Sequence, residues 1–405
     1  MVTFPHEWEL APLASLLSEP LSYGINAPAV PYNRSLPTYI RITDINEDGT
    51  YNDTDKASVI SSEAYKYQLK NGDIVLARTG ASTGKSYLYT DKDGALVFAG
   101  FLIKAAIDFK KHNPYYIFCQ LHTRRYWDWV AMISMRSGQP GINSKEYGSL
   151  LIPVTDKTEQ DRIAETLTFF DTHIANLTEL IEKKKAIREG ALEDLISGRT
   201  RIHGFSEKWV EYQISEITQT IITGGTPTTT RKEYYGGNIP WLSSTEIHQK
   251  LITTPTTYIT DLGLQYSSAK IAPESSVLIA LAGQGKTRGT AAYLTSAMAL
   301  NQSLAALVAN DKCNSEFLYY LIDSMYYPLR EISSGDGGRG GLNKKLLANI
   351  IVTIPKDIAE QEAIATVLQT MDNEIHSLEI ELDKIKQIRE GAMDDLLTGK
   401  VRLKD

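Results

Sequence analysis

Residues 160–202 read QDRIAETLTFFDTHIANLTELIEKKKAIREGALEDLISGRTRI, and residues 361–403 read QEAIATVLQTMDNEIHSLEIELDKIKQIREGAMDDLLTGKVRL. Aligned at a constant offset of 201 residues, the two stretches are identical at 18 of 43 positions. Solenoid repeats are about 20–50 residues long, so one repeat at this much longer period is typical of a duplicated domain. The sequence therefore predicts two copies of one structural unit.

The same offset continues outside these stretches. Matching pairs are Phe4 and Phe205, Trp8 and Trp209, and the segments Gly84-Lys85-Ser86 and Gly285-Lys286-Thr287. Near Asn143 and Asn343 the offset slips by one residue, as a loop insertion would cause. Each unit thus has a globular part followed by the repeated stretch.

The repeated stretch has the apolar pattern of a coiled-coil helix, because its apolar residues alternate steps of four and three. In the second copy these are Ile364, Leu368, Met371, Ile375, Leu378, Leu382 and Ile385; in the first they are Ile163, Leu167, Phe170, Ile174, Leu177 and Ile181, followed by Lys184. We expect the two helices to pack antiparallel against each other. The alternative, in which each helix is buried against its own domain, stays open.

Residues at the helix ends have capping character. Thr158 with Asp161, and Asp357 with Glu360, resemble capping pairs at the starts. Gly198 and Gly399 lie where a helix would end in a left-handed turn. Helices of about 37 residues would span roughly 55 Å, which makes them candidate spacers.

The globular parts contain short β-rich runs, such as residues 73–77 and 277–281, separated by Gly, Asn, Asp and Thr. The expected fold is α+β, with two similar globular α/β domains, two long antiparallel coiled-coil helices and an internal pseudo-two-fold repeat. The expected divisions are domain 1 at 1–155, the central helix at 156–202, domain 2 at 203–355 and the C-terminal helix at 356–405.

Composition excludes several classes of protein. The first seven residues have no signal-peptide pattern, and the longest apolar stretch, 95–103, is too short to span a bilayer. The two cysteines, Cys119 and Cys313, form no CxxC motif, and no HExxH or HxxxH pair occurs. We therefore expect no metal site and a cytoplasmic location.

Two motifs resemble those of nucleotide or methyl-donor enzymes but depart from them. The glycines of 80–86 and 283–287 are separated by three residues and by one, whereas a P-loop has four. Asn113-Pro114-Tyr115-Tyr116 lacks the second proline of an Asn-Pro-Pro-Tyr motif, and Asn as N-cap with Pro at the first helical position explains it. Acidic pairs such as Glu193-Asp194 lie on the helices, where solvated faces are expected. The sequence predicts no catalytic residue.

Polar and basic loops occur at corresponding places in the two globular parts. Arg and Lys suit guanine edges and phosphates, and Asn and Gln suit adenine edges, so these loops are candidate DNA contacts. The candidates in the first part are Arg78, Thr79, Ser82, Lys85, Ser86, Arg124, Arg125, Arg136, Gln139, Asn143 and Lys145. The candidates in the second part are Arg231, Lys232, Gln284, Lys286, Arg288, Arg339, Asn343 and Lys344. Lys85 is expected to contact a phosphate.

The duplicated arrangement resembles the specificity subunit of type I restriction-modification systems over essentially the whole chain. The features that carry the resemblance are the Ile-Arg-Glu-Gly-Ala stretch and the Ser/Thr-Gly-Arg/Lys end of each helix, the Phe…Trp start of each unit, the strand at 72–80 and the Ser-Gly-x-x-Gly-x-Asn loop at 137–143. The second unit departs from the pattern in its longer, glycine-rich loop at 333–341.

The resemblance implies two target-recognition domains, each reading one half of a bipartite, non-palindromic site in double-stranded DNA. It also implies that the helices set the spacing and bind two modification subunits. Those subunits would hold S-adenosylmethionine and methylate adenine, while restriction subunits would use ATP and Mg and cleave DNA. This chain itself would hold no cofactor and no active site.

Two rival interpretations stay open. One is a coiled-coil scaffold that does not bind DNA, and the other is a nucleotide-dependent transferase that uses the Gly-Lys-Ser/Thr loops. The net charge of −7 does not exclude DNA binding, because residues 1–155 carry 15 basic and 15 acidic side chains and residues 203–355 carry 12 of each. The acidic excess lies on the helical segments, so we expect weak DNA binding by this chain alone.

Overall fold

The computed structural model describes residues 4–134, 141–283, 285–333 and 341–404. Contacts divide the chain into two compact units: unit 1 comprises residues 1–178 and 380–405, and unit 2 comprises residues 179–379. The two long helices, α4 (Lys157–Ile196) and α10 (Ile358–Leu396), each contribute one part to each unit. The sequence predicted that each long helix is a segment separate from the globular domains. The compact units instead each include part of both helices, so the domain boundaries expected from the sequence stay a prediction.

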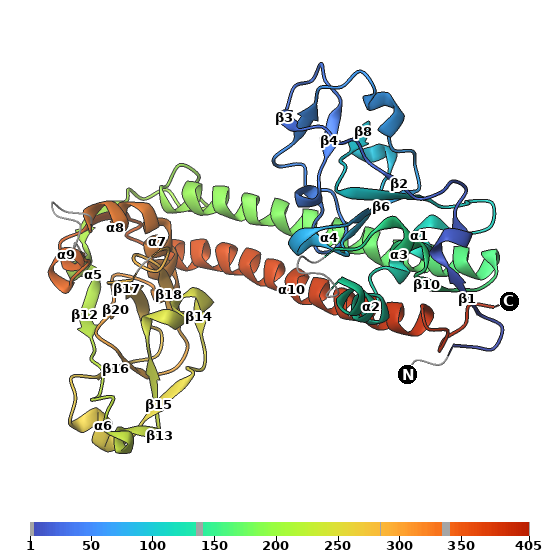
Figure 1. Ribbon diagram of the computed structural model, residues 1–405. Helices are drawn as coiled ribbons and strands as arrows, with labels where there is room; N and C mark the ends of the chain where they lie inside the picture. Colours follow the sequence, from blue (N-terminus) through green and yellow to red (C-terminus); the bar gives the residue numbers. More distant parts are fainter. Residues whose placement is uncertain (1–3, 135–140, 284, 334–340, 405) are drawn as a thin grey trace. The chain divides into compact units, whose positions relative to one another are not determined.

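Unit 1 contains two small sheets and a two-stranded pair, with strand orders β2-β9-β6-β7, β3-β5-β4-β8 and β1-β10 (Figure 1). The strands are β1 (Glu9–Pro12), β2 (Ser22–Tyr23), β3 (Ala29–Pro31), β4 (Thr38–Ile40), β5 (Ala57–Val59), β6 (Asp73–Ala77), β7 (Ser86–Leu88), β8 (Leu96–Phe98), β9 (Leu102–Ala106) and β10 (Leu151–Val154). The α-helices are α1 (Pro114–Gln120), α2 (Arg124–Ser134) and α3 (Ser144–Gly148). The 3-10 helices are η1 (Leu13–Leu16), η2 (Ile42–Asp44), η3 (Ala64–Tyr67), η4 (Gly80–Ser82) and η5 (Asp91–Asp93).

Unit 2 repeats this plan with strand orders β12-β20-β17-β18-β14, β15-β13-β19-β16 and β11-β21. The strands are β11 (Val210–Gln213), β12 (Thr218–Thr223), β13 (Tyr235–Leu242), β14 (Leu251–Ile252), β15 (Thr257–Ile259), β16 (Lys270–Ala272), β17 (Val277–Ala280), β18 (Ala291–Leu294), β19 (Met298–Leu300), β20 (Leu304–Ala309) and β21 (Ile351–Ile354). The helices are α5 (Ile214–Ile217), α6 (Asp261–Gln265), α7 (Ser315–Ser324), α8 (Tyr326–Ile332), α9 (Lys344–Ala348), η6 (Lys232–Tyr234) and η7 (Ser244–Gln249).

The central strands β6 and β17 correspond to each other. Both are fully buried, and both lie between two antiparallel neighbours, β9 and β7 in unit 1 and β20 and β18 in unit 2. Their aliphatic residues fit such a position, because a strand buried on both faces reads as a continuous apolar run. This confirms the strands expected near 73–77 and 277–281. The pseudo-repeat of an α+β fold is therefore present in the backbone pairing as well as in the sequence.

The helix pairing is antiparallel within each unit. In unit 1 Asp171 of α4 accepts a hydrogen bond from Arg389 of α10. In unit 2 Arg188 of α4 donates to Asp372 of α10, with an Nε–Oδ1 distance of 2.8 Å. Residue numbers fall on α10 as they rise on α4, and the two ion pairs are the same pair exchanged between the repeats at the offset of 201. Repeated contacts of this kind fix the register of the two helices.

Both burial modes left open for the helices occur. Leu177 and Ile181 are buried along the middle of α4, where the helices pair. Ile163 and Leu167, near the start of α4, belong instead to the hydrophobic core of unit 1. Leu396, at the end of α10, belongs to the same core, so this domain is completed by the end of the other helix.

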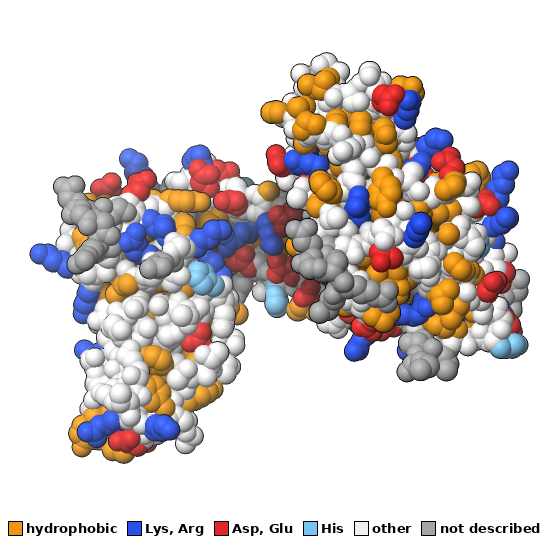
Figure 2. Space-filling model, in the orientation of Figure 1, with side chains coloured by type: hydrophobic (Ala, Val, Ile, Leu, Met, Phe, Trp, Pro, Cys, Tyr) orange, Lys and Arg blue, Asp and Glu red, His pale blue; other side chains and the backbone are white. Residues whose placement is uncertain are grey.

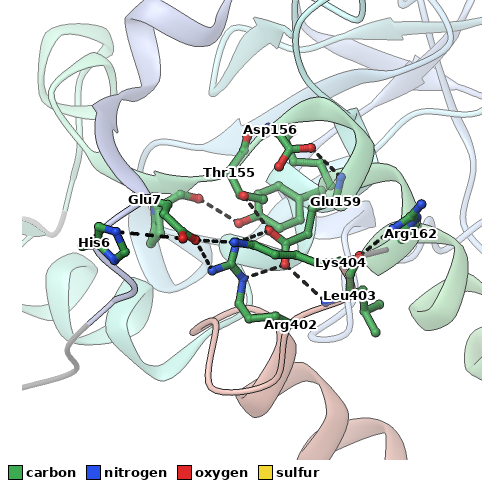
Figure 3. A network of polar contacts seen from close by, with 12 residues as sticks. His6, Glu7, Thr155, Asp156, Glu159, Arg162, Arg402, Leu403 and Lys404 are labelled. Carbon is green, nitrogen blue, oxygen red and sulfur yellow. Dashed lines mark hydrogen bonds and ion pairs between the residues drawn. The ribbon is translucent and has the colours of Figure 1, made fainter.

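The residues after each helix fold back against the start of the other helix. Gly399 has a φ of 72°, and the chain beyond it carries Arg402 to Glu159 of α4, with Nε–Oε1 and Nη2–Oε2 distances of 2.7 Å (Figure 3). The Glu159 carboxylate also accepts from the Thr155 hydroxyl, while Glu7 accepts from Arg402. Bidentate pairing of a guanidinium with a buried carboxylate is strong and geometrically specific.

Unit 2 repeats this closure with its own residues. Gly198 also has a φ of 72°, and Arg201 donates to Glu360, with an Nη2–Oε2 distance of 2.8 Å. Arg201 lies over the ring of Trp209, as Arg402 lies over the ring of Trp8. The left-handed ends expected at both glycines are confirmed.

The capping residues expected at the helix starts are partly wrong. Helix α4 begins at Lys157, before the expected Thr158–Asp161 pair, and the Asp156 carboxylate accepts the Glu159 amide at 3.0 Å. The corresponding Asp357 does cap α10, by accepting the Ala359 amide at 2.9 Å. Glu360, expected as its partner, binds Arg201 instead.

Candidate nucleic-acid interface

The loop between β6 and β7 is a hairpin connection. Residues 80–85 lead directly into strand β7, and in unit 2 residues 285–290 lead directly into strand β18. A P-loop needs a helix after its glycines, so that backbone N–H groups and the helix dipole bind the phosphate. Because a strand and not a helix follows each loop, the described residues give no support to a nucleotide site.

Two predicted contacts on this hairpin have partners within the protein. Lys85 forms an ion pair with Glu47 at 2.7 Å, and its side chain is 18% exposed. Ser86 is buried, and its Oγ lies 3.1 Å from Nε2 of His122. Burial lowers the pKa of His122 to about 4, so this imidazole is neutral near pH 7. The geometry of Ser86 does not support a DNA contact, and a phosphate at Lys85 would have to displace Glu47.

Arg78 follows β6 and lies next to the ring of Tyr23, with 4.8 Å between its Cζ and the ring centroid. Thr79 forms an isolated β-bridge with Gly141. Arg78, Thr79 and Asn143 line one pocket of about 360 Å³. The structure thus brings together three residues that the sequence proposed separately. Ser82, at the end of η4, is half-buried and lies outside this pocket.

Helix α2 carries two predicted contacts with different environments. Arg124 is exposed. Arg125 donates to the Leu151 carbonyl at 2.8 Å and lies over the ring of Phe4. Burial lowers the pKa of Arg125. Its guanidinium therefore joins α2 to β10 and the N-terminal segment, whereas Arg124 is available to a partner.

Helix α3 begins at a capping box. The Asn143 Oδ1 accepts the amides of Lys145 and Glu146, at 2.9 and 3.0 Å, while the Glu146 carboxylate accepts the Asn143 amide. Asn143 is exposed, so its side-chain NH₂ remains on the surface beside the pocket. Lys145 is also exposed.

The predicted contacts in unit 2 lie in three loops. Arg231 and Lys232 are exposed next to η6, and Arg231 lies over the ring of Tyr234. Lys286 is exposed, whereas Arg288 is half-buried and its carbonyl accepts from Arg330.

The third loop leads into α9. Asn343 caps this helix by accepting the Leu346 amide at 2.9 Å, and Lys344 is exposed at the first helical position. Four further predicted contacts lie outside the described residues: Arg136, Gln139, Gln284 and Arg339.

Sequence reasoning missed the aromatic and apolar surface residues near these loops. Tyr23 is 39% exposed, and Phe101, whose carbonyl accepts the Arg78 amide, is 58% exposed. Exposed apolar residues elsewhere on the two globular parts include Ile60, Tyr65, Tyr258, Leu262 and Tyr266. Single apolar residues in loops carry no periodic signal, so only the fold reveals that they are exposed.

The charge pattern is mixed. On the face of unit 1 visible in Figure 2, Lys and Arg side chains are interspersed with Asp and Glu side chains. This agrees with the equal numbers of basic and acidic residues in 1–155. Such a surface favours recognition by local contacts over binding through one broad basic face.

The described ranges contain no cluster of three or more His, Cys, Asp or Glu residues that could hold a metal ion. No helix in the same ranges has the length and hydropathy of a membrane-spanning segment. The Asn113 side chain accepts the amides of Tyr115 and Tyr116, which confirms it as the cap of α1.

The fold thus defines a class of proteins in which one α+β scaffold occurs twice in a single chain and carries different loops in its two copies. The sequence profile of the type I restriction modification DNA specificity domain matches residues 37–186 and again residues 206–387. The chain belongs to this family. It is a specificity subunit, a DNA-recognition component and not an enzyme, and the scaffold alternative has no support.

Two curated relatives and one solved structure agree with this family assignment. The chain is 24% identical to the putative type I restriction enzyme MjaX specificity subunit of Methanocaldococcus jannaschii, over 99% of this chain and 95% of that protein. It is 23% identical to the HindI specificity subunit of Haemophilus influenzae, over 83% and 88% of the two chains. The fold resembles the crystal structure of a type I S subunit from M. genitalium, with a TM-score of 0.64, 17% identity and 96% coverage of both chains.

Proposed function

We propose that each globular domain reads one half of a bipartite, non-palindromic site in double-stranded DNA. The observation that carries the proposal is a repeated scaffold with different loop chemistry. The ion pairs Arg389–Asp171 and Arg188–Asp372 are equivalent. The loops differ: the Ile142 amide donates to the Arg78 carbonyl in unit 1, whereas the Leu342 amide donates to the Leu281 carbonyl in unit 2, so Leu281 takes the place of Arg78. Because site symmetry follows protein symmetry, a symmetric frame with unlike contacts favours two unlike half-sites.

We further propose that the helices bind two modification subunits. The exposed faces of α4 and α10 carry apolar side chains that the helix pair leaves uncovered, including Phe169, Ile187, Ile380 and Ile388. Ile187 and Ile388 are equivalent at the offset of 201, as two equivalent docking positions require. The modification subunits would supply S-adenosylmethionine and adenine methylation, and restriction subunits would supply ATP- and Mg-dependent cleavage. The assembly would act in the cytoplasm, where these substrates and the chromosome meet.

A matched deletion in both helices tests this proposal. Removing residues 175–178 and 376–379 shortens each helix by about one turn, roughly 6 Å. Both deleted segments lie between the Asp171–Arg389 and Arg188–Asp372 pairs, so both ion pairs are kept.

We expect the spacer between the half-sites to shorten by about two base pairs, at roughly 3.4 Å per pair, while both half-sites stay the same. The measurement is sequencing of methylated genomic DNA from cells that carry the modification subunits. A changed half-site at unchanged spacing would contradict the proposal.

A further inference from the structure

The pocket next to Arg78 has the polar groups of a base-reading site. It is lined by Arg78, Thr79, Asn143 and Glu146, with Ile133 and Ile142 as its apolar part. The backbone that forms it is fixed, because the Ile142 amide donates to the Arg78 carbonyl at 2.9 Å. All of these residues belong to unit 1.

Tyr23 holds the Arg78 side chain in place. The guanidinium Cζ lies 4.8 Å from the Tyr23 ring centroid, within the range of a cation–π contact. The ring is itself fixed, because the Tyr23 hydroxyl accepts the Ser144 amide at 3.1 Å. Among the described residues, the Arg78 guanidinium contacts the Tyr23 ring and makes no ion pair and no side-chain hydrogen bond. Its donors are therefore oriented but unused.

An arginine stacked on an aromatic ring presents its planar edge to a ligand. That edge matches O6 and N7 of guanine, the commonest specific arginine contact in the major groove. The Glu146 carboxylate in the same pocket would repel a phosphate. It can instead accept a hydrogen bond from N4 of cytosine, which is the contact that acidic residues make with base edges.

We propose that Arg78, positioned by Tyr23, reads a guanine in the half-site of unit 1, with Glu146 facing the paired cytosine. This inference rests on the proposed function, because it names the base pair that one of the two domains recognises. Arg78 is the contact residue, and Tyr23 is a positioning residue that acts through it.

In unit 2 a leucine, Leu281, occupies the backbone position of Arg78. Two equivalent hydrogen bonds show the correspondence. The Arg78 amide donates to the Phe101 carbonyl, and the Leu281 amide donates to the Ser303 carbonyl. The Leu342 amide donates to the Leu281 carbonyl, as Ile142 does to Arg78.

The other two pocket residues also change. Tyr23, which pairs with Ile103 of β9, corresponds to Thr223, which pairs with Ala305 of β20. Three residues after the capping asparagine, Glu146 is replaced by Leu346. The guanine contact therefore belongs to one half-site only.

The test uses the complete complex with modification subunits, carrying Arg78→Ala, Arg78→Lys, Tyr23→Leu or Tyr23→Phe. Lys110→Ala, an exposed lysine of unit 1 outside the pocket, is the matched control. Two readouts apply: the methylated motif in genomic DNA, and binding to duplexes in which each base pair of the motif is replaced in turn.

We expect Arg78→Ala to lower discrimination at one G·C pair about tenfold or more, with the other half-site unchanged. Tyr23→Leu should lower discrimination at the same pair by less than Arg78→Ala does. Tyr23→Phe keeps the ring but loses its hydrogen bond to the Ser144 amide, so it should lower discrimination least. Arg78→Lys should fall between the wild type and Arg78→Ala. The Lys110→Ala motif should match the wild type.

Two results would overturn the inference and leave the proposed function intact. Equal weakening by Arg78→Ala on every duplex, with a smaller salt slope, would identify a phosphate contact. Unchanged discrimination in all four variants would show that the pocket does not face the bases. In contrast, a wild-type complex that methylates no bipartite motif would overturn the proposed function itself.

Discussion

Glu159 shows how much a single side chain contributes to the fold. Its carboxylate is almost fully buried and joins the start of α4 to Arg402, which lies 243 residues away. At the offset of 201 residues Glu159 corresponds to Glu360, and Arg201 corresponds to Arg402. Nothing local marked them as partners, because a long-range ion pair leaves no trace in periodicity or spacing.

We predict that Arg402→Ala destabilises unit 1 by roughly 3 kcal/mol, since it leaves a buried carboxylate without its cation. Hydrogen exchange should then be faster in β1 and β10 than in the wild type, with β11 and β21 unaffected. Arg201→Ala is the matched control and should show the reverse pattern. If either variant made hydrogen exchange equally faster in both units, the proposal that each ion pair stabilises only its own unit would be contradicted.

The Glu159 carboxylate makes the stability of unit 1 depend on pH. Hydrogen bonding to Arg402 lowers the pKa of Glu159 from its ordinary value of 4.5 to about 2. Because the folded pKa lies below the unfolded pKa, the stabilisation is complete above about pH 4.5 and is lost as the pH falls toward 2. The difference in unfolding free energy between wild type and Arg402→Ala, measured from pH 7 to pH 2, should shrink over that interval. A difference independent of pH would count against the assigned pair.

At the scale of elements, the buried apolar face of the long helices could be predicted from the sequence. The residues at which the helices begin could be predicted only in part. The apolar steps of four and three located Leu177 and Ile181, which are buried. Thr158 was predicted as the cap, but α4 begins at Lys157 and Asp156 accepts the Glu159 amide instead. The prediction was wrong because capping sequences are short and recur by chance. The polar loops were found from composition, whereas the pocket at Arg78 required the folded backbone.

The two helix-ending glycines give a matched pair of substitutions. Both have a φ of 72°, which costs about 1 kcal/mol for alanine. A Cβ at Gly399 would lie 2.6 Å from Pro5, whereas one at Gly198 would meet Trp209 at an ordinary 3.4 Å. We predict that Gly399→Ala lowers the unfolding free energy by more than Gly198→Ala does, as measured by denaturant unfolding. Equal losses would show that Pro5 moves away without cost.

At the scale of the whole molecule, the chain presents two recognition domains without a charge excess. The net charge of −7 lies on the helical segments, and each globular part has equal numbers of basic and acidic residues. Non-specific affinity for DNA depends on the number of phosphates neutralised. Recognition and electrostatic attraction are therefore expected to be divided between this chain and its partners.

We predict that the chain alone binds its DNA site weakly, with a salt slope smaller than that of the complex with modification subunits. Titrations at several salt concentrations measure both slopes. Lys85→Ala should reduce the slope by less than one full phosphate contact, because Glu47 already neutralises this lysine. Equal slopes for the chain and the complex would refute the proposed division.

The central claim is that the two recognition domains act independently, each on its own half-site. A chain that carries two copies of the same recognition domain tests this claim most directly. In this chain residues 203–355 are replaced by a second copy of residues 1–155, with both helices retained. Methylated genomic DNA is then sequenced from cells that contain the modification subunits. We predict a methylated motif that is an inverted repeat of the unit 1 half-site at unchanged spacing. A motif that still contains the original second half-site would contradict it.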